Sequence, residues 1–202
     1  MKKALLMAAL AAAVVGGAFG GGKQAVSTFT DKRDGKVYRI VEIGGAVWMA
    51  ENLNFAAKGS VCYDNKAANC AKYGRLYNWK TALTVCPAGT HLPDDDEWTT
   101  LENAVVGRST AGTKLKSAAG WNEDGNGTDD YGFLALPSGG GLSDGNFDGI
   151  GNYGVWWSAT EYDATYAWLR CMFYDCDYVC RVIRDKTSLY SVRCVQNKEG
   201  EQ

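Results

Sequence analysis

The pattern of hydrophobic and polar residues first becomes regular at residues 37–43, where β-branched residues are interrupted by single polar ones. Turn-forming pairs flank this segment, Asp34-Gly35 before it and Gly44-Gly45 after it. Runs of β-branched residues bounded by turn residues are typical of strands. We therefore predict a β-strand here.

A helix is predicted to start at Asp94. Asp94 is a suitable N-cap, Glu97 stands three residues later, and apolar residues follow at helical spacing at Trp98, Leu101 and Val105. An N-cap acid followed by a Glu at the third helical position is the signature of a capping box. Carboxylates are also favoured at the positive end of the helix dipole. We interpret this acidic run as helix-stabilising rather than catalytic, and Trp98 as part of the core.

The second half of the chain divides into a loop-like part and a strand-like part. Residues 107–154 are rich in Gly, Asn, Asp and Ser and have only brief apolar islands, which predicts a long ordered loop region. Short aromatic or β-branched runs separated by turns follow, and they predict antiparallel strands. These runs are residues 155–159, 167–174, 178–184 and 189–195.

The N-terminus has the order of a secretory signal peptide. Two lysines precede an apolar stretch at residues 4–15, and small residues follow up to Gly20. The apolar stretch is shorter than the roughly 20 residues that a helix needs to span a bilayer. We predict a bacterial signal peptide at residues 1–20, a linker at residues 21–28, and a secreted or cell-surface protein without a transmembrane segment.

Charge and cysteine content narrow the function classes. The formal net charge of −2 becomes −4 once the two lysines of the predicted signal peptide are removed, and this acidic balance disfavours nucleic acid as a partner. The chain has seven cysteines, which in an exported protein favour disulfides over a reduced metal cluster. Because seven is an odd number, at least one thiol per monomer stays unpaired.

Local spacing predicts two disulfides. Cys62 and Cys70 bracket a short polar loop that a bond between them can close. A hairpin turning at Cys176 would set Cys171 opposite Cys180, which predicts a cross-strand disulfide. Cys176 would then remain at the exposed tip as a free thiol, available for a disulfide-linked dimer.

A set of specific motifs is spread over residues 29–197. They are Asp34-Gly35-Lys36-Val37-Tyr38, Trp48-Met49-Ala50-Glu51-Asn52-Leu53-Asn54, Tyr73-Gly74-Arg75-Leu76-Tyr77-Asn78-Trp79, Cys86-Pro87, His91-Leu92-Pro93, Glu97-Trp98, Gly132-Phe133, Ala135-Leu136-Pro137, Trp157-Ser158 and Ser191-Val192-Arg193-Cys194. Together these motifs resemble the Fibrobacter succinogenes major paralogous domain family. One departure is Thr90, because an aromatic residue usually precedes the histidine in that family.

The resemblance implies an α+β, C-type-lectin-like fold of the branch that includes formylglycine-generating enzymes. Such a fold has two short helices, a long irregular loop region and a C-terminal antiparallel sheet, and residues 198–202 would form a polar tail. It would also bring Cys86 and Cys194 together as a long-range disulfide. Loops carry function on scaffolds of this kind, so the resemblance places ligand binding in residues 107–165.

Two segments of the loop region have oxygen-bearing side chains at alternate positions, followed by Gly, as in loops that coordinate calcium. Ordinary tight turns use the same residue types, and both interpretations stay open. The candidate calcium ligands are Asp144, Asn146 and Asp148, with Asn122, Asp124 and Asn126 as the second set.

Aromatic residues are abundant, with seven Trp and eleven Tyr, and aromatic faces can stack on sugar rings. Trp156 and Trp157 are adjacent in a predicted strand, so their side chains should point to opposite faces and one could face the loops or solvent. Trp121, Tyr153 and Tyr162 flank the loop region. We expect these five residues to form a ligand-binding surface.

The leading hypothesis is a secreted or cell-surface, non-catalytic module that binds extracellular polysaccharide or another surface ligand. His91 is the only histidine, and it supports neither a nucleophile–base pair nor a zinc site. The spacing of Cys171 and Cys176 resembles the copper-binding cysteine pair of formylglycine-generating enzymes, and thiolates bind Cu(I), so a copper thiol oxidase is the alternative. A structural or protein-binding component of the envelope is the third hypothesis.

Overall fold

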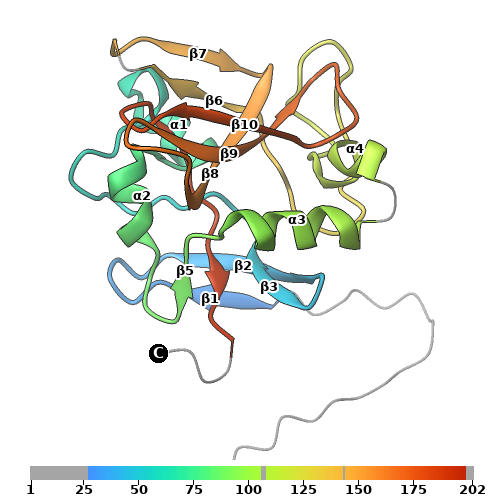
Figure 1. Cartoon of the computed structure of the whole chain (residues 1–202), viewed down its shortest axis with the longest axis horizontal. Coiled ribbons are helices and arrows are strands. Elements are labelled where there is room, and N and C mark those ends of the chain that lie inside the picture. The colour runs from blue at the N-terminus through green and yellow to red at the C-terminus, as the bar shows by residue number, and fades with distance from the viewer. Residues whose placement is uncertain (1–26, 106–107, 143, 199–202) are drawn as a thin grey trace, which may run out of the picture.

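The computed structural model describes residues 27–105, 108–142 and 144–198. Within these ranges the chain forms two sheets and four short α-helices, with α3 (Asp95–Ala104) lying between the sheets (Figure 1). The predicted signal peptide, most of the predicted linker and residues 199–202 lie outside the described residues. No helix in the described ranges is both long enough and apolar enough to cross a membrane.

The smaller sheet has the strand order β1-β2-β3-β12-β5 and joins the two ends of the described chain. β2 occupies the strand predicted from the sequence and pairs antiparallel with β3. β12 lies between β3 and β5, with Val195 opposite both Trp48 and His91. The strands are β1 (Thr28–Thr30), β2 (Val37–Ile43), β3 (Ala46–Met49), β5 (Thr90–His91) and β12 (Val195–Gln196).

The larger sheet contains most of the predicted C-terminal strands and has the order β10-β9-β8-β11-β4. β6 pairs with β8, and β7 pairs with β6. β11 runs parallel to β8, after which the chain enters the smaller sheet as β12. The strands are β4 (Leu76–Tyr77), β6 (Ser138–Gly141), β7 (Phe147–Ile150), β8 (Tyr153–Glu161), β9 (Tyr166–Phe173), β10 (Cys180–Asp185) and β11 (Tyr190–Ser191).

Helix α3 begins where the sequence predicts. The Asp94 carboxylate accepts a hydrogen bond from the Glu97 amide at 2.8 Å, and the Glu97 carboxylate accepts one from the Asp94 amide at 3.0 Å, which confirms the capping box. The other α-helices are α1 (Ala67–Tyr73), α2 (Trp79–Val85) and α4 (Ala111–Leu115). The described residues therefore hold two more helices than expected, and the α+β class is confirmed.

The predicted loop region is more regular than expected, because it contains α4, β6 and β7. β6 has the sequence Ser-Gly-Gly-Gly, and its glycines allow a close approach of neighbouring backbone: a Cβ atom on Gly139 would lie 2.5 Å from the Asp148 carbonyl oxygen. A strand of three glycines has no alternation of apolar and polar side chains. The sequence pattern therefore gave no signal for it.

An aromatic layer fixes α3 between the two sheets. Trp98 of α3 lies 4.9 Å from Trp48 of the smaller sheet and 6.4 Å from Trp156 of the larger sheet, measured between ring centroids. Phe133 packs edge-on against Trp48 and Trp98. All four rings are fully buried, so burial of their apolar area is a main source of stability here.

A buried charge network adds to this packing. Arg170 of β9 donates to Glu102 Oε1 at 2.6 Å and to Asp95 Oδ1 at 2.5 Å. Arg181 of β10 reaches the same Asp95 carboxylate at 2.9 Å. The acidic first turn of α3 therefore has a role beyond the helix dipole, since it fastens the helix to the larger sheet.

The described residues form three disulfides, and these are the three predicted pairs: Cys62–Cys70, Cys86–Cys194 and Cys171–Cys180. Cys86 ends α2 and Cys194 directly precedes β12, so this bond ties the last strand to the first half of the chain. Cys176 is free and partly exposed in the turn between β9 and β10.

Candidate functional site

Three of the five aromatic residues expected to bind a ligand are buried. Trp156 and Trp157 are both 0 % exposed, and Trp121 is 5 % exposed. This corrects the expectation that one residue of the Trp156-Trp157 pair faces the loops or solvent. Both faces of β8 are covered, because Trp98 packs against Trp156 on one side and Tyr190 lies 5.1 Å from Trp157 on the other.

Trp121 is held in the interior by polar contacts. Its Nε1 donates to Ser117 Oγ at 3.1 Å and to the Ala135 carbonyl at 3.2 Å. The Lys116 ammonium lies 5.2 Å from the ring centroid and covers it. The ring is therefore a structural anchor of the loop region and offers no face to a ligand.

The two tyrosines of the set remain accessible. Tyr162 is 53 % exposed, and its ring meets Trp168 edge-on at 5.3 Å. Tyr153 is half-buried and lines a hollow of about 230 Å³ on one face of the larger sheet. Tyr162 is not among the residues that line this hollow. The hollow at Tyr153, called the β8–β10 hollow below, is our candidate site.

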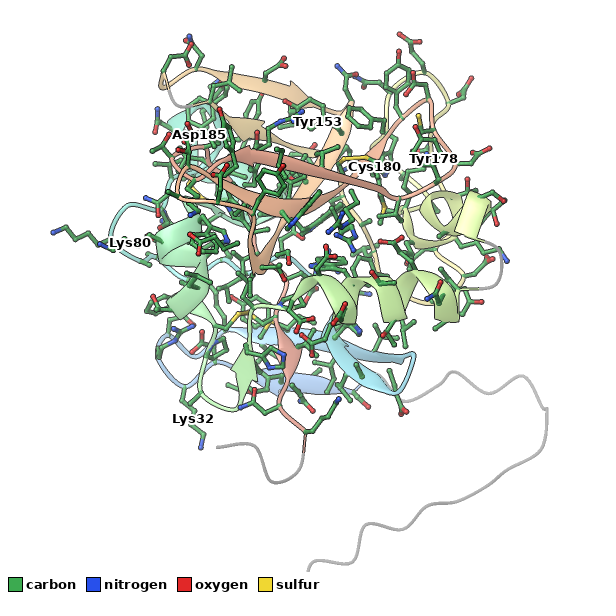
Figure 2. The ribbon with its side chains drawn as sticks, viewed as in Figure 1. Lys32, Lys80, Tyr153, Tyr178, Cys180 and Asp185 are labelled. Atoms are coloured by element: carbon green, nitrogen blue, oxygen red, sulfur yellow. A yellow bond between two sulfur atoms is a disulfide. The ribbon has the colours of Figure 1, made fainter. Side chains whose placement is uncertain are left out.

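Residues of three neighbouring strands form the β8–β10 hollow. Alternate residues of a strand point to the same face, and this places Val155, Leu169 and Val182 together in its floor beside the Cys171–Cys180 disulfide. The rings of Tyr153, labelled in Figure 2, and Phe173 pack with centroids 5.7 Å apart. The apolar and aromatic lining residues are Leu142, Tyr153, Val155, Leu169, Cys171, Phe173, Val182 and Tyr190.

Two charged residues complete the lining, Asp148 from β7 and Arg184 from β10. In the order of strand pairing, these strands lie on either side of β8 and β9. Tyr153 Oη donates to Asp148 Oδ2 at 3.4 Å, and burial together with the negative charge of Asp148 raises the pKa of Tyr153. Arg184 is exposed and uses one donor on the Ile183 carbonyl at 2.9 Å. The hollow thus offers a carboxylate acceptor, guanidinium donors and aromatic faces between them.

The first set of predicted calcium ligands is engaged in local contacts. The Asp144 carboxylate accepts hydrogen bonds from the Asn146 amide and from Asn146 Nδ2, both at 2.9 Å, as in an ordinary Asx turn. Asp148 lines the β8–β10 hollow and accepts from Tyr153.

The second set lies in a separate turn. Asn122 Nδ2 donates to Asn152 Oδ1 at 2.9 Å, Asn126 Oδ1 accepts from the Trp121 amide at 3.0 Å, and Asp124 has a left-handed backbone with φ of 59°. In the ranges that the structure covers, no group of three or more His, Cys, Asp or Glu side chains is placed to hold a metal ion. Calcium binding stays a prediction.

The two cysteines of the copper hypothesis differ in oxidation state. Cys171 is bonded to Cys180, whereas Cys176 is free. Copper binding by Cys171 and Cys176 needs two thiolates, so it needs reduction of the Cys171–Cys180 bond first. Copper binding also stays a prediction.

Alkylation of the unreduced protein is expected to modify Cys176 alone, because the other six cysteines are held in disulfides. Peptide mapping by mass spectrometry would locate the label. On non-reducing gels, any dimer that the native protein forms should be lost in Cys176→Ser. Label on Cys171 or Cys180 in the unreduced protein would contradict this assignment and favour the copper hypothesis.

His91 joins two parts of the fold. Its Nε2 lies 2.9 Å from Glu97 Oε1, in the first turn of α3, and its Nδ1 lies 2.8 Å from Asn197 Oδ1, just after β12. The Glu97 carboxylate also accepts from the Asp94 amide. Both ring nitrogens therefore serve the junction between α3 and the end of the smaller sheet.

Comparison with known proteins identifies the family of this chain. The family model described as the Fibrobacter succinogenes major domain matches residues 41–196. No curated protein and no solved structure matched the chain. Because the matched segment covers most of the chain and contains both sheets' central strands, the protein belongs to the Fibrobacter succinogenes major domain family.

Proposed function

We propose that the protein is an exported, non-catalytic module that binds an extracellular polysaccharide in the β8–β10 hollow. The signal-peptide pattern supports export, and three disulfides are typical of proteins that fold in an oxidising compartment. We further propose that its α+β fold is C-type-lectin-like. The observation that carries the binding proposal is the combination of aromatic rings with Asp148 and Arg184 in one small hollow.

The chemistry of the hollow suits one ring of a sugar chain. The apolar face of a pyranose can pack on the rings of Tyr153 and Phe173, while its hydroxyls donate to Asp148 and accept from Arg184. Hydrogen bonds to charged groups are the stronger class, and they fix orientation. The volume of about 230 Å³ is below the roughly 300–1,000 Å³ of pockets that enclose larger ligands. A single ring of a longer chain therefore fits better than a compact oligosaccharide.

The lining argues for binding rather than hydrolysis. Glycosidases of the usual kind need two carboxyl groups that flank the scissile bond. Among the residues that line the hollow, Asp148 is the carboxylate and the other charged group is Arg184. This pair can orient a sugar, but it lacks the acid and base of that mechanism.

Arg184→Gln and Asp148→Asn are expected to weaken polysaccharide binding about tenfold each, equivalent to about 1.4 kcal/mol, because each removes one charge-assisted hydrogen bond. Both side chains are exposed, so the fold should be unaffected. Retention on insoluble polysaccharides followed by calorimetry on the best binder would measure the loss. The matched controls are Lys80→Gln and Asp130→Asn, which are exposed and lie outside the hollow.

The same assay, repeated with a chelator, tests the calcium prediction separately. Loss of binding with chelator and recovery with added calcium would support a calcium-dependent site. If the protein retained no polysaccharide under either condition, or if both site variants bound as tightly as the native protein, the proposed function would be wrong.

A further inference from the structure

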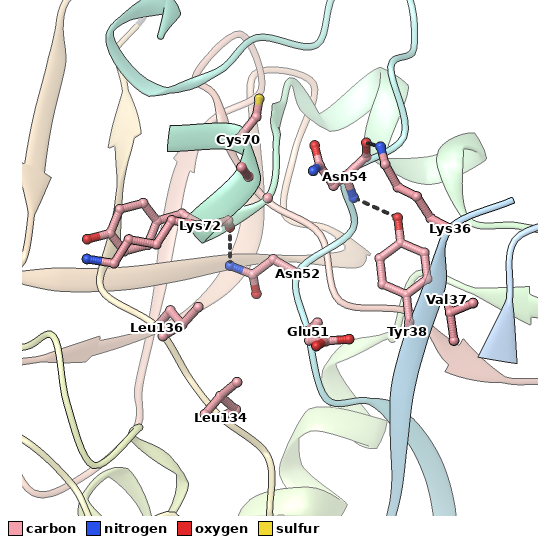
Figure 3. Close-up of a pocket in the computed structure, with 13 residues that line it drawn as sticks. Lys36, Val37, Tyr38, Glu51, Asn52, Asn54, Cys70, Lys72, Leu134 and Leu136 are labelled. Carbon is pink, nitrogen blue, oxygen red and sulfur yellow. Dashed lines mark hydrogen bonds between the residues drawn. The ribbon is translucent and has the colours of Figure 1, made fainter. Parts of the chain in front are cut away.

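The polar side chains of a second hollow, beside α1 and β2, do not converge on one point. This hollow has a volume of about 230 Å³, and within its wall the Asn54 amide donates to the Tyr38 hydroxyl at 3.1 Å (Figure 3). The ammonium group of Lys72 lies on the opposite side of the hollow from that of Lys36. A more specific pattern lies in the loop region, at residues 126–128.

These residues have the sequence Asn-Gly-Thr. Asn-x-Ser and Asn-x-Thr, with any residue except Pro in the middle, are the acceptor patterns for glycosylation of the asparagine side chain. No other asparagine of the chain is followed two residues later by Ser or Thr. Asp124 stands two residues before Asn126, so a transferase that also requires an acidic residue on that side would find one. Because the pattern is short, its structural setting decides whether the site is usable.

The two side chains that define the pattern are both accessible. Asn126 and Thr128 are exposed, and the hydroxyl of Thr128 has only a long hydrogen bond, 3.5 Å, to the Thr113 carbonyl. The tight turn at residues 122–125 precedes them and is closed by a hydrogen bond of 2.9 Å between its first carbonyl and its last amide. An exposed loop of a secreted protein is the setting in which this acceptor pattern is expected to be used.

The amide group of Asn126 is oriented by the fold. Its Oδ1 accepts from the backbone amide of Trp121 at 3.0 Å. A backbone amide can only donate, so the oxygen must face it, and this fixes which end of the side chain is the nitrogen. Within the described ranges no acceptor receives Nδ2. Nδ2 is the atom that bonds to the sugar, and the amide keeps its carbonyl oxygen. The folded protein can therefore carry a glycan at Asn126 and retain the hydrogen bond to Trp121.

We propose that Asn126 carries an N-linked glycan, added after export from a lipid-linked oligosaccharide diphosphate. Asn126 Nδ2 bonds to the anomeric carbon of the first sugar, the bond between that carbon and the diphosphate breaks, and Nδ2 loses one proton. The lipid diphosphate leaves, and no group is oxidised or reduced. The inference goes beyond the proposed function. It rests on the export that the proposed function also assumes, but not on sugar binding in the β8–β10 hollow.

Peptide mapping by mass spectrometry tests the proposal on protein recovered from the exported fraction of its native host. The peptide that contains Asn126 should carry the mass of an oligosaccharide, and fragmentation should place it on this residue. Asn126→Gln and Thr128→Ala, expressed in the same host, should both lose the added mass. Thr128→Ser is the matched control and should keep it, because the pattern accepts either hydroxyl. Thr128→Ala retains Asn126 and its hydrogen bond, so it tests the site even if Asn126→Gln perturbs the fold.

Two results would overturn the proposal. The first is an exported protein whose Asn126 peptide is wholly unmodified. The second is added mass that persists in Asn126→Gln or in Thr128→Ala, which would place the sugar on another residue. The polysaccharide-retention assay is a separate measurement on the β8–β10 hollow, so either proposal can fail while the other stands.

Discussion

Arg193→Met is expected to lower the free energy of unfolding by about 3–5 kcal/mol. The guanidinium donates to Asn52 and to three backbone carbonyls, of which the Leu134 carbonyl is partly buried and the others are buried. Methionine fills a similar volume but leaves these carbonyls of Met49, Phe133 and Leu134 without a donor. An unsatisfied buried acceptor costs about 1–3 kcal/mol, and three of them set the size of the effect.

A countervailing effect reduces this loss. Burial lowers the pKa of Arg193 to about 9, so the side chain is still charged at neutral pH, and the folded protein bears the cost of desolvating that charge. Methionine removes this cost. The net loss should remain large because the guanidinium donates to three carbonyls at once, those of Met49, Phe133 and Leu134.

Urea unfolding of native protein and Arg193→Met would measure the difference, with Arg39→Met as the matched control. Arg39 forms an exposed ion pair with Glu51, and exposed pairs contribute at most about 1 kcal/mol. Arg193→Lys keeps the charge but loses the planar guanidinium with its several donors. Its free energy of unfolding should therefore lie between those of the native protein and Arg193→Met. If the free energies of unfolding of Arg193→Met and of the native protein differed by less than about 1 kcal/mol, the guanidinium would not be a net source of stability.

The sequence predicts those elements whose signals are local. β2 has a run of β-branched residues between turns, and the start of α3 has a capping box, so a short window of residues defines each. The Cys62–Cys70 and Cys171–Cys180 bonds follow in the same way from a short loop and from a hairpin. β6 has no such signal, since close packing of glycines creates it. The strand predicted at residues 189–195 is divided in the structure into β11 and β12, which pair with distant strands of different sheets.

The candidate sites were predictable only in part, for a related reason. Tyr153 and Asp148 were expected to contact different ligands, although they stand only five residues apart, on either side of the turn between β7 and β8. The pairing of β8, β9 and β10 is what brings Arg184 to the same hollow. Nothing in the sequence indicated that Arg184 binds a ligand, because one arginine in a strand is an ordinary surface residue. The acidic run at α3 was interpreted from the helix alone, whereas its Asp95 also binds Arg170 and Arg181 from the larger sheet.

Removing the Cys86–Cys194 bond is the second change with a large expected effect. In the chain-entropy description, a disulfide stabilises a protein by restricting the unfolded chain, and the gain grows with the logarithm of the loop it closes. This bond spans a sequence separation of 108 residues, and Cys62–Cys70 spans 8. The expected losses of unfolding free energy are about 5 kcal/mol for the first and about 2.5 kcal/mol for the second.

Urea unfolding without reductant tests this expectation. It compares two double variants, Cys86→Ala/Cys194→Ala and Cys62→Ala/Cys70→Ala. Both should be made in a Cys176→Ser background, because the free thiol of Cys176 could otherwise exchange with the remaining bonds. Alanine avoids burying a hydroxyl at Cys194, which is fully buried. Loss of the long-range bond also releases the segment that carries β12. Val195 of this strand pairs with Trp48 and His91. The smaller sheet should therefore be the first part of the protein to lose protection from hydrogen exchange. Equal losses for the two pairs would contradict the entropic account and would show that native contacts, rather than restriction of the unfolded chain, decide what each disulfide contributes.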